Sequence, residues 1–562
     1  MIKPKRIWAV LLTACMLLTF APMQAFASTT NGKCGDNVFY SFDFDTDHLN
    51  INGEGAIRSY TYSNNAPWYS FSDNIVSVNI EPGVTGIGDY AFFWCDKITS
   101  VTISNSVKSI GMGAFENCKA LTSVNIPDGV ESIGIGAFEN CEALTSVNIS
   151  GSVKSIGEKA FSGCYVSAEY AEDGIEKGLE KVTIQDGVES IDTFAFSGCK
   201  KLTDVTLPDS VTIIGDNAFQ NTGLYDLYNH TGWEVCYIGS HLIAANQSIS
   251  GTCTVKRGTK TIAGRAFDSC SDLESIIIPD SVVSIGNHAF FSCSSLKSIT
   301  IPKNVTSIGD EVFYNCFDLA SINVDSDNLA YCSEGGVLYN KEKTEIIRYP
   351  KEKSGALFAI PDGVTSISVG AFADCANLIS VTIPDSVVSI GDSAFSECSS
   401  LINVRILDGV IEIGYRTFYK CSRLKSITIP NSVLIIGKEA FAECTKLENV
   451  YYIGSPTDWD EVIGDGKYTL DNVGITPISG ISANRSDDGK IVVKPCNIAV
   501  GKTVILALYD GDKFVEMQQS SEYSETNREI TFTPTKPYTR AKVMVWNSLS
   551  GMSPVCDFKI VK

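Results

Sequence analysis

The sequence predicts a solenoid of short parallel strands with a 23-residue period, followed by a small all-β domain. The first observation is a direct duplication, because residues 114–136 and 137–159 are nearly identical. The second is a Phe that recurs in thirteen turns, always with an Ile five residues before it. The third is a Cys three residues after that Phe in twelve of the turns. Self-similarity at a period of roughly 20–29 residues is typical of leucine-rich repeat solenoids.

Each turn is expected to contain one short parallel strand and an apolar return side. In "LTSVNIP", Leu121, Val124 and Ile126 are predicted to point inward, whereas Ser123 and Asn125 face outward. A Gly follows the repeat Ile in ten turns, which predicts a tight corner that needs permissive backbone angles. One turn cannot bury its apolar face, but stacked turns form a continuous core.

The cysteine column is predicted to be a row of small buried hydrophobes. Stacked cysteines at this period lie about 5 Å apart with parallel side chains, which is poor geometry for a disulfide. Metal ligands usually converge on one point, and a column does not. Some disulfides, and with less support a metal site, stay open as alternatives. The column consists of Cys95, Cys118, Cys141, Cys164, Cys199, Cys270, Cys293, Cys316, Cys375, Cys398, Cys421 and Cys444.

Two turns depart from the regular spacing. Residues 225–265 form a longer stretch that is predicted to be a strand-rich turn. In residues 325–361, "GVLY" and "EIIRYP" flank "NKEKT", which predicts a hairpin that projects from the rod.

The recurring motif "IGxxAFxxCxxLxxVxIPxxV" resembles the BspA-like leucine-rich repeat proteins of bacterial cell surfaces. The turn "GGVLYNKEKTEIIRYP" and the N-terminal "APWYSFSDNIVSVNIEPGVTGIGDYAF" carry the same resemblance, which covers most of the chain. The resemblance implies the solenoid fold and a secreted or surface-exposed adhesive role. It defines no binding residues.

Residues 28–72 are predicted to be an N-terminal cap for the solenoid, which spans 73–450. Asp43, Asp45, Asp47 and Glu54 have the spacing of ligands in a calcium loop. However, His48 occupies the position that such a loop reserves for glycine, and alternation along "FYSFDFDTDHLNI" is typical of a strand pair. A hairpin is therefore favoured over a calcium site.

Beyond the solenoid, residues 451–479 are predicted to be a C-terminal cap and residues 480–562 a small β-sandwich-like domain. The segments "KIVVKP", "TVILALYDGDKF", "EITFTP" and "AKVMVWNS" have the composition of strands between polar turns. Cys496 and Cys556 could pair across this domain, although two buried thiols are favoured. A sandwich of this kind does not define a function.

The first 27 residues have the features of an export signal. Basic residues precede an apolar run, and "AFA" gives a cleavage site after Ala27. A lipoprotein signal that would lipidate Cys15 is the less favoured alternative. No later segment is predicted to span a membrane, and the net charge of −21 argues against nucleic acid and anionic lipid as partners.

The sequence contains no recognisable catalytic, metal or cofactor motif. Its four histidines are scattered, and no nucleophile elbow, phosphate loop or dinucleotide fingerprint occurs. The prediction is a non-enzymatic protein with no cofactor. Two alternatives stay open: a carbohydrate-binding protein that acts through residues 480–562, with Trp546 as a candidate, and a glycan hydrolase whose carboxylates converge only in the fold.

The outward face of the parallel strands is the predicted binding surface for an extracellular protein or glycan. Small uncharged side chains form two columns along it, and these columns change character at three positions, Ile277, Asn403 and Arg405. Apolar and arginine side chains are better contact anchors than Ser or Thr, so these three are the candidate ligand-binding residues. The columns are Ser100, Ser123, Ser146, Ser298, Ser321, Ser380 and Ser426 beside Thr102, Asn125, Asn148, Thr300, Asn323, Thr382 and Thr428.

Overall fold

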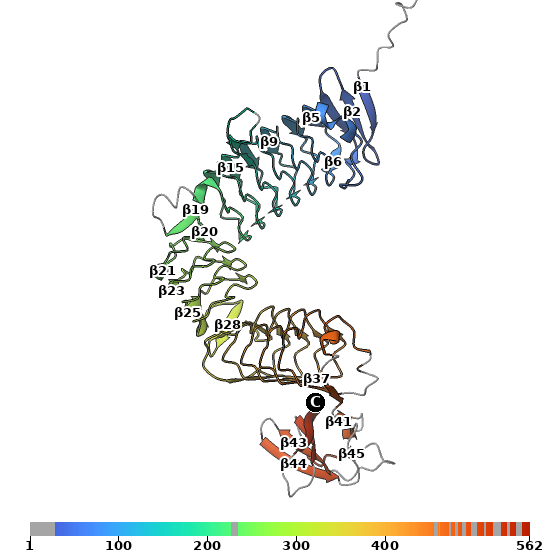
Figure 1. The fold of residues 1–562 in the computed structure, drawn as a ribbon, viewed down its shortest axis with the longest axis vertical. Coiled ribbons are helices and arrows are strands. Elements are labelled where there is room, and N and C mark those ends of the chain that lie inside the picture. The colour runs from blue at the N-terminus through green and yellow to red at the C-terminus, as the bar shows by residue number, and fades with distance from the viewer. Residues whose placement is uncertain are drawn as a thin grey trace, which may run out of the picture.

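The protein is a curved β-solenoid with a group of antiparallel strands beyond its last turn (Figure 1). The computed structural model describes residues 29–171, 173–225, 234–453, 459 and 461–470, the strands between 474 and 561, and residues 533–536. Within this part, each regular turn contributes a strand of about four residues to one sheet and a two-residue strand to a second sheet. The predicted solenoid class is therefore confirmed.

The first segment of the solenoid contains the most regular turns. Its long strands form one sheet in the order β1 (Thr29–Lys33), β2 (Val38–Asp43), β3 (His48–Gly53), β5 (Ser77–Ile80), β7 (Ser100–Ile103), β9 (Ser123–Ile126), β11 (Ser146–Ile149), β15 (Lys181–Ile184) and β17 (Asp204–Thr206). Its short strands are β4 (Gly55–Ala56), β6 (Val84–Ile87), β8 (Ser109–Ile110), β10 (Ser132–Ile133), β12 (Ser155–Ile156), β16 (Ser190–Ile191) and β18 (Ile213–Ile214).

The second segment begins where the first irregular turn interrupts both sheets. Its long strands are β21 (Gly251–Thr254), β23 (Leu273–Ile277), β25 (Ser298–Ile301) and β27 (Ser321–Val324). The other sheet contains β19 (Val235–Ile238), β20 (His241–Ala245), β22 (Thr261–Ile262), β24 (Ser284–Ile285) and β26 (Ser307–Ile308). Strands β19 and β20 form an antiparallel hairpin, so the predicted strand-rich turn is confirmed.

The third segment follows the second irregular turn. Its long strands are β31 (Leu357–Ala359), β33 (Ser380–Ile383), β35 (Asn403–Ile406), β37 (Ser426–Pro430), β39 (Asn449–Ile453) and β40 (Gly474–Pro477). The other sheet contains β28 (Tyr331–Glu334), β29 (Val337–Asn340), β30 (Glu345–Arg348), β32 (Ser366–Ile367), β34 (Ser389–Ile390), β36 (Glu412–Ile413) and β38 (Ile435–Ile436).

The 23-residue period sets the register of the stacked strands. Equivalent residues pair in adjacent turns, as Ser123 does with Ser146 and Ile126 with Ile149. The turns around the repeat Phe form a further ladder, because the Phe115 amide donates to the Ala137 carbonyl of the next turn at 2.7 Å. Each repeat therefore satisfies its backbone polar groups through its neighbours on several sides.

The repeat Phe and Cys build the core together. Neighbouring Phe rings stack nearly parallel, with centroids 4.9 Å apart between Phe92 and Phe115 and 5.2 Å between Phe115 and Phe138. The Cys thiol donates to the carbonyl of the Phe in the preceding turn, as Cys141 does to Phe115 at 3.3 Å. All described cysteines are free, and those of the column are buried except the half-buried Cys444. The prediction of buried thiols is confirmed for the described residues.

The glycine that follows the repeat Ile serves a different purpose from the one predicted. Neither Gly111 nor Gly134 has a positive φ, so the expectation of a permissive corner is wrong. A Cβ on Gly111 would lie 2.7 Å from the backbone nitrogen of Asp89 in the preceding turn. The glycine therefore allows close approach of two turns. Positive φ occurs beside the Phe instead, at 62° in Asn117 and 57° in Asn140.

Residues 325–361 do not project from the solenoid, which corrects the sequence prediction. Strands β29 and β30 form the expected antiparallel hairpin. However, Val337, Leu338 and Tyr339 are buried, and β30 pairs in parallel with β32 of the next turn. The hairpin is part of the wall and core of the rod because its apolar side chains complete the interior where the regular turns are interrupted.

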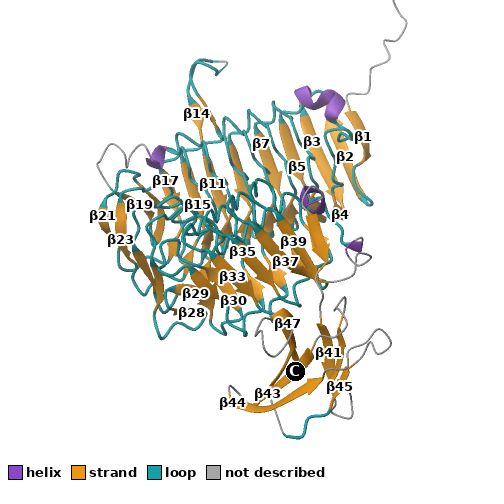
Figure 2. Ribbon diagram, turned by 60° about the horizontal axis from the view of Figure 1, so that its bottom comes forward, coloured by secondary structure: helices purple, strands orange, loops and turns teal. Residues whose placement is uncertain are grey.

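A short insertion after Cys164, which the sequence did not reveal, projects from the solenoid. Strands β13 (Tyr165–Val166) and β14 (Lys177–Gly178) form a short hairpin after Cys164, and its loop extends away from the sheets in Figure 2. Tyr170 and Ile175 in this loop are exposed.

Aromatic side chains close the N-terminal end of the Phe stack. Trp68 precedes the 3-10 helix η1 (Tyr69–Asn74), is fully buried and stacks on Phe92 with centroids 5.2 Å apart. Strands β2 and β3 pair as the predicted hairpin, with Asp43 opposite His48. In the described residues no group of acidic, His or Cys side chains has the arrangement of a metal site.

Two further strands, β39 and β40, extend the solenoid before the chain reaches the final antiparallel strands. Strand β39 pairs with β37, and β40 pairs with β39, so the predicted cap region extends the long-strand sheet. The 3-10 helix η2 (Lys467–Leu470) follows, and Tyr452 packs edge-on against Trp459 at 5.0 Å.

The final strands form two antiparallel sheets, in agreement with the predicted sandwich-like domain. One sheet contains β41 (Ile481–Arg485), β42 (Ile491–Pro495) and β45 (Ile530–Phe532). The other has the order β44 (Lys513–Ser520), β43 (Thr503–Asp510), β46 (Arg540–Trp546) and β47 (Pro554–Val561). The side chains of Cys496, Cys556 and Trp546 lie outside the described part, as do residues 1–28. Within the described residues, no helix is long and apolar enough to cross a membrane.

Candidate functional site

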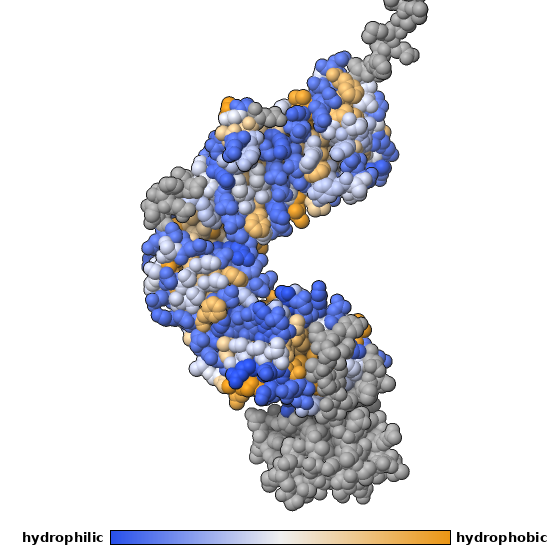
Figure 3. Space-filling view, viewed as in Figure 1, coloured by the Kyte–Doolittle hydropathy of each residue, from blue (hydrophilic) through white to orange (hydrophobic). Residues whose placement is uncertain are grey.

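The outward face of the long strands has the polar columns that the sequence predicts. Strands β7, β9 and β11 share the burial pattern exposed, buried, exposed, buried. All fourteen predicted column residues are exposed or half-buried. Their partners in register hold the backbone in place, so this face is a preformed surface of mainly uncharged side chains. The serine column is interrupted by Lys181 and Asp204, which form an ion pair at 2.7 Å. In Figure 3 the visible face of the solenoid is mainly hydrophilic, with separated apolar positions.

Ile277 is an exposed apolar side chain on this face. It ends β23, and 55% of its surface is accessible to solvent. Leu357 is a second such side chain that the sequence analysis missed, with 75% of its surface exposed. Leu357 pairs in register with Ser380 and therefore occupies the serine column. An alignment of "LFAIP" with "SVTIP" would have revealed it, but the irregular spacing of 325–361 concealed that match.

Asn403 and Arg405 lie on β35, in a different sheet from Ile277. Asn403 is exposed and accepts a hydrogen bond from Ser426 Oγ at 2.7 Å, whereas Arg405 is half-buried between Thr382 and Thr428. The three candidate residues therefore share the outward columns but do not form one cluster.

A second surface runs beside the repeat Phe on the return side of the turns. We call it the Phe-flanking ribbon, and it consists of the three residues before and the two after each repeat Phe. Stacking of the turns brings residues of different repeats together on this ribbon. Its charged and aromatic side chains therefore form clusters whose members are distant in sequence.

One ribbon cluster bridges the first interruption of the repeat. His288 Nδ1 lies 2.6 Å from Asp216 Oδ2, and His288 Nε2 lies 3.3 Å from Glu311 Oε2. These two hydrogen bonds raise the pKa of His288 to about 9. Arg265 pairs with Asp216 at 3.2 Å and lies over the Phe291 ring, 5.3 Å from its centroid. The cluster is ionic and structural, since its polar groups bind one another.

A second charged cluster lies at the interruption between β27 and β31. Arg348 is buried and donates to the carbonyls of Phe313 at 3.2 Å, of Ala373 at 3.3 Å and of Gly370. Lys351 lies 3.7 Å from the Asp374 carboxylate. Burial lowers the pKa of Lys351 and raises that of Asp374.

A hollow of about 360 Å³ opens beside this interruption, next to strands β26 and β30. Two of its three carboxylates have partners: Glu345 accepts from Ser368 Oγ at 2.6 Å, and Glu311 contacts His288, whereas Asp310 is exposed. Carboxylates engaged in this way are poorly placed for acid–base chemistry.

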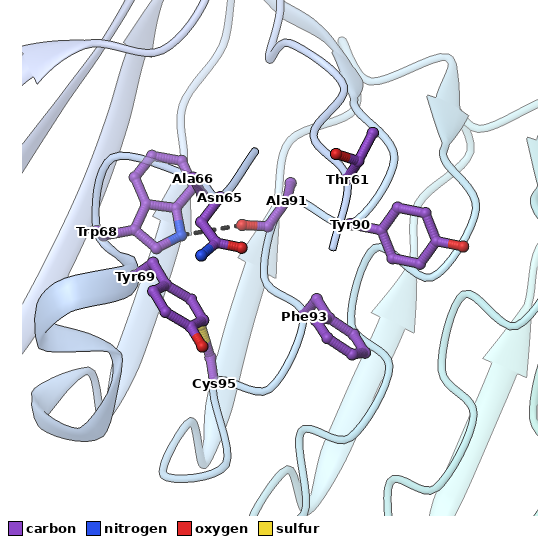
Figure 4. A pocket seen from close by; sticks show the side chains of 9 residues that line it. All are labelled: Thr61, Asn65, Ala66, Trp68, Tyr69, Tyr90, Ala91, Phe93 and Cys95. Carbon is purple, nitrogen blue, oxygen red and sulfur yellow. Dashed lines mark hydrogen bonds between the residues drawn. The ribbon is translucent and has the colours of Figure 1, made fainter. Parts of the chain in front are cut away.

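The first turns carry an aromatic cluster, which we call the N-terminal aromatic patch: the exposed Tyr62 and Trp94 with the half-buried Tyr90 and Phe93. Tyr62 lies 4.8 Å from the Tyr90 ring and 4.9 Å from the Phe93 ring, centroid to centroid. Figure 4 shows the adjoining hollow, with Tyr69 on one side and Tyr90 and Phe93 on the other. Tyr90, Phe93 and Trp94 differ from the residues that most other turns have at the same repeat positions, and such departures are the signal that could have found them.

The column thiols are unsuited to nucleophilic chemistry. Burial raises the pKa of Cys118, Cys199 and Cys421 well above the ordinary value. The reactive thiolate is therefore suppressed.

Comparison with known proteins gives one family and several solved structures. The family model described as "BspA type Leucine rich repeat region (6 copies)" matches residues 61–175, 174–251, 260–354 and 349–463, well over half of the chain. No curated protein matches the chain.

Three solved structures illustrate the similarity. A leucine rich cell surface protein from Faecalibacterium prausnitzii is 27% identical, covers 77% of this chain and 97% of its own, and has a TM-score of 0.34. A leucine-rich repeat protein from Bacteroides ovatus is 22% identical, with 79% and 99% coverage and a TM-score of 0.26. The pneumococcal vaccine antigen PcpA is 16% identical, with 79% and 98% coverage and a TM-score of 0.32.

Proposed function

Because the chain belongs to the BspA-type leucine-rich repeat family, we propose that it is a secreted or cell-surface protein that binds an extracellular protein or glycan without catalysis. The export signal that the sequence predicts in residues 1–27, with cleavage after Ala27, supports this location. The similar protein from Faecalibacterium prausnitzii is a cell surface protein, which agrees with this location.

The observation that carries the proposal is the rigid strand face with its two apolar interruptions. Uncharged side chains cost less to desolvate than charged ones, which suits a surface that must release water on binding. Ile277 and Leu357 add exposed apolar area, and Arg405 adds a multidentate donor on the same columns. We assign the ligand contacts to Ile277, Leu357, Asn403 and Arg405.

The test is binding of the full chain to immobilised extracellular-matrix proteins and mucin glycans. The double variant Ile277→Asp with Arg405→Glu should lose at least about tenfold in affinity, since anchor residues contribute about 2 kcal/mol or more. Leu357→Asp should weaken binding in the same direction.

The matched control is Thr102→Asp with Lys181→Glu, which makes the same change of net charge at outward positions of the first sheet. It should bind as the wild type does. Unchanged affinity in the Ile277 and Arg405 variant would contradict the strand-face site and favour residues 480–562. Turnover of a glycan would contradict the non-enzymatic role.

A further inference from the structure

The N-terminal aromatic patch is unusual for its exposure. Tyr62 and Trp94 expose 64% and 61% of their surfaces, although ring contacts of 4.8–5.9 Å hold the four rings together. Contiguous exposed aromatic groups on a rigid support are typical of interaction sites. The adjoining hollow is small, about 10 Å³, so a ligand must lie on the rings.

Two carboxylates border the patch. Glu116 and Glu139 occupy the same repeat position as Phe93, one and two turns further along. A Cβ on Gly113 would lie 2.5 Å from the Tyr90 ring and 3.1 Å from Glu116 Oε2, so the ring and the carboxylate converge above this glycine. Burial, and secondly the charge of Glu139, raise the pKa of Glu116, so the two carboxylates lie within electrostatic reach of each other.

The same ribbon holds arginine beside aromatic rings and carboxylates in later turns. Arg265 lies over Phe291 and pairs with Asp268 at 2.9 Å. Arg416 lies 4.8 Å from the Tyr419 centroid and pairs with a ribbon carboxylate of the next turn at 2.6 Å. Both arginines stand two residues before the repeat Phe, and an aromatic residue stands directly after that Phe in the same or the next turn.

In the first turns the arginine is missing. Tyr90, Gly113 and Gly136 occupy the position two residues before the Phe. Among the described residues, no Lys or Arg stacks on the four patch rings or forms an ion pair with Glu116 or Glu139. The aromatic and acidic partners of a cation are present. Lys159, whose charge acts on Glu139, forms its ion pair with Glu158 instead, at 3.3 Å.

We propose that the N-terminal aromatic patch, with Glu116 and Glu139, binds an arginine or lysine side chain on a basic segment of a protein partner. The cation lies against the faces of Tyr62 and Trp94 and is paired by the two carboxylates. Cation–π contacts and ion pairs reinforce each other where the carboxylates are partly shielded from water. The net charge of −21 steers a basic partner toward the protein. This site is separate from the strand face.

The test uses the full chain and isothermal titration calorimetry with the capped peptide Gly-Arg-Gly-Arg-Gly. A second peptide carries citrulline, which keeps the shape of arginine but lacks its charge. The arginine peptide should bind and the citrulline peptide should not. Tyr62→Ala with Trp94→Ala should weaken arginine-peptide binding about tenfold, as should Glu116→Gln with Glu139→Gln.

Two matched controls separate the site from general attraction to an acidic protein. Tyr170→Ala removes an exposed aromatic ring of the β13–β14 loop, and Asp186→Asn with Asp362→Asn removes two exposed carboxylates elsewhere. Both should bind the peptide as the wild type does, and Ile277→Asp with Arg405→Glu should too. Equal losses in the controls and the patch variants would overturn the proposal. Equal binding of both peptides would also overturn it. So would a result in which the arginine peptide does not bind but a neutral glycan binds and loses affinity in the patch variants.

Discussion

The regular turns of the first segment and the two interruptions of the repeat are held together by different interactions. Between residues 92 and 219 each turn contacts the next through the Phe stack and the strand ladders, and as far as Cys199 also through thiol–carbonyl bonds. At the interruptions, charged side chains add to the backbone and apolar contacts: Asp216 and His288 at the first, Arg348 at the second. Residues of equivalent repeat position no longer all pair there, and long polar side chains supply part of the contact between turns.

The largest effect is expected in the regular turns. Phe138→Ala removes a ring that stacks on both Phe115 and Phe161, at 5.2 Å and 5.1 Å. The loss of transfer energy and the cavity should lower the free energy of unfolding by about 3–5 kcal/mol. Urea denaturation followed by circular dichroism measures it, with the exposed Tyr170→Ala as the control. Wild-type stability in Phe138→Ala would contradict the stacked core.

A smaller effect is expected at the second interruption. Arg348→Met keeps the apolar stem but removes the donors to Phe313, Gly370 and Ala373. Buried carbonyls that lose a charged donor should cost about 2–3 kcal/mol. In the same urea assay, Arg423→Met is the control, because Arg423 is exposed. A neutral or stabilising result would show that the hairpin packing alone joins the segments.

The smallest effect is a pH dependence at the first interruption. The pKa of His288 is raised to about 9 in the fold, against an unfolded value of about 6.5. Its stabilising contribution is therefore complete below pH 6.5 and is lost as pH rises through 9. Solvent screening reduces this contribution, because His288 is partly exposed. The difference in unfolding free energy between wild type and His288→Gln should therefore be about 1–2 kcal/mol at pH 6. The difference should approach zero at pH 10. A difference independent of pH would contradict the ionic bridge.

The candidate site was only partly predictable. Ile277 could be placed on the outward face because it lies in a regular turn, and its exposure agrees with that placement. The outward position of Leu357 was not predicted, because the segment before it lacks the regular 23-residue spacing. The N-terminal aromatic patch was not predicted, because Phe93 and Glu116 are 23 residues apart in the sequence and become neighbours only when the turns stack.

The sequence by itself determined the period, the inward and outward sides of each strand, and the buried cysteine column. These follow from local patterns that each turn repeats, so one turn predicts the next. Three features became clear only from the tertiary structure. These are the reason why Gly111 must be small, the burial of Val337 to Tyr339 in the core, and the partners of the cationic side chains in the Phe-flanking ribbon. These features depend on contacts between residues 22 to 72 positions apart, and such contacts exist only after the turns have packed against each other.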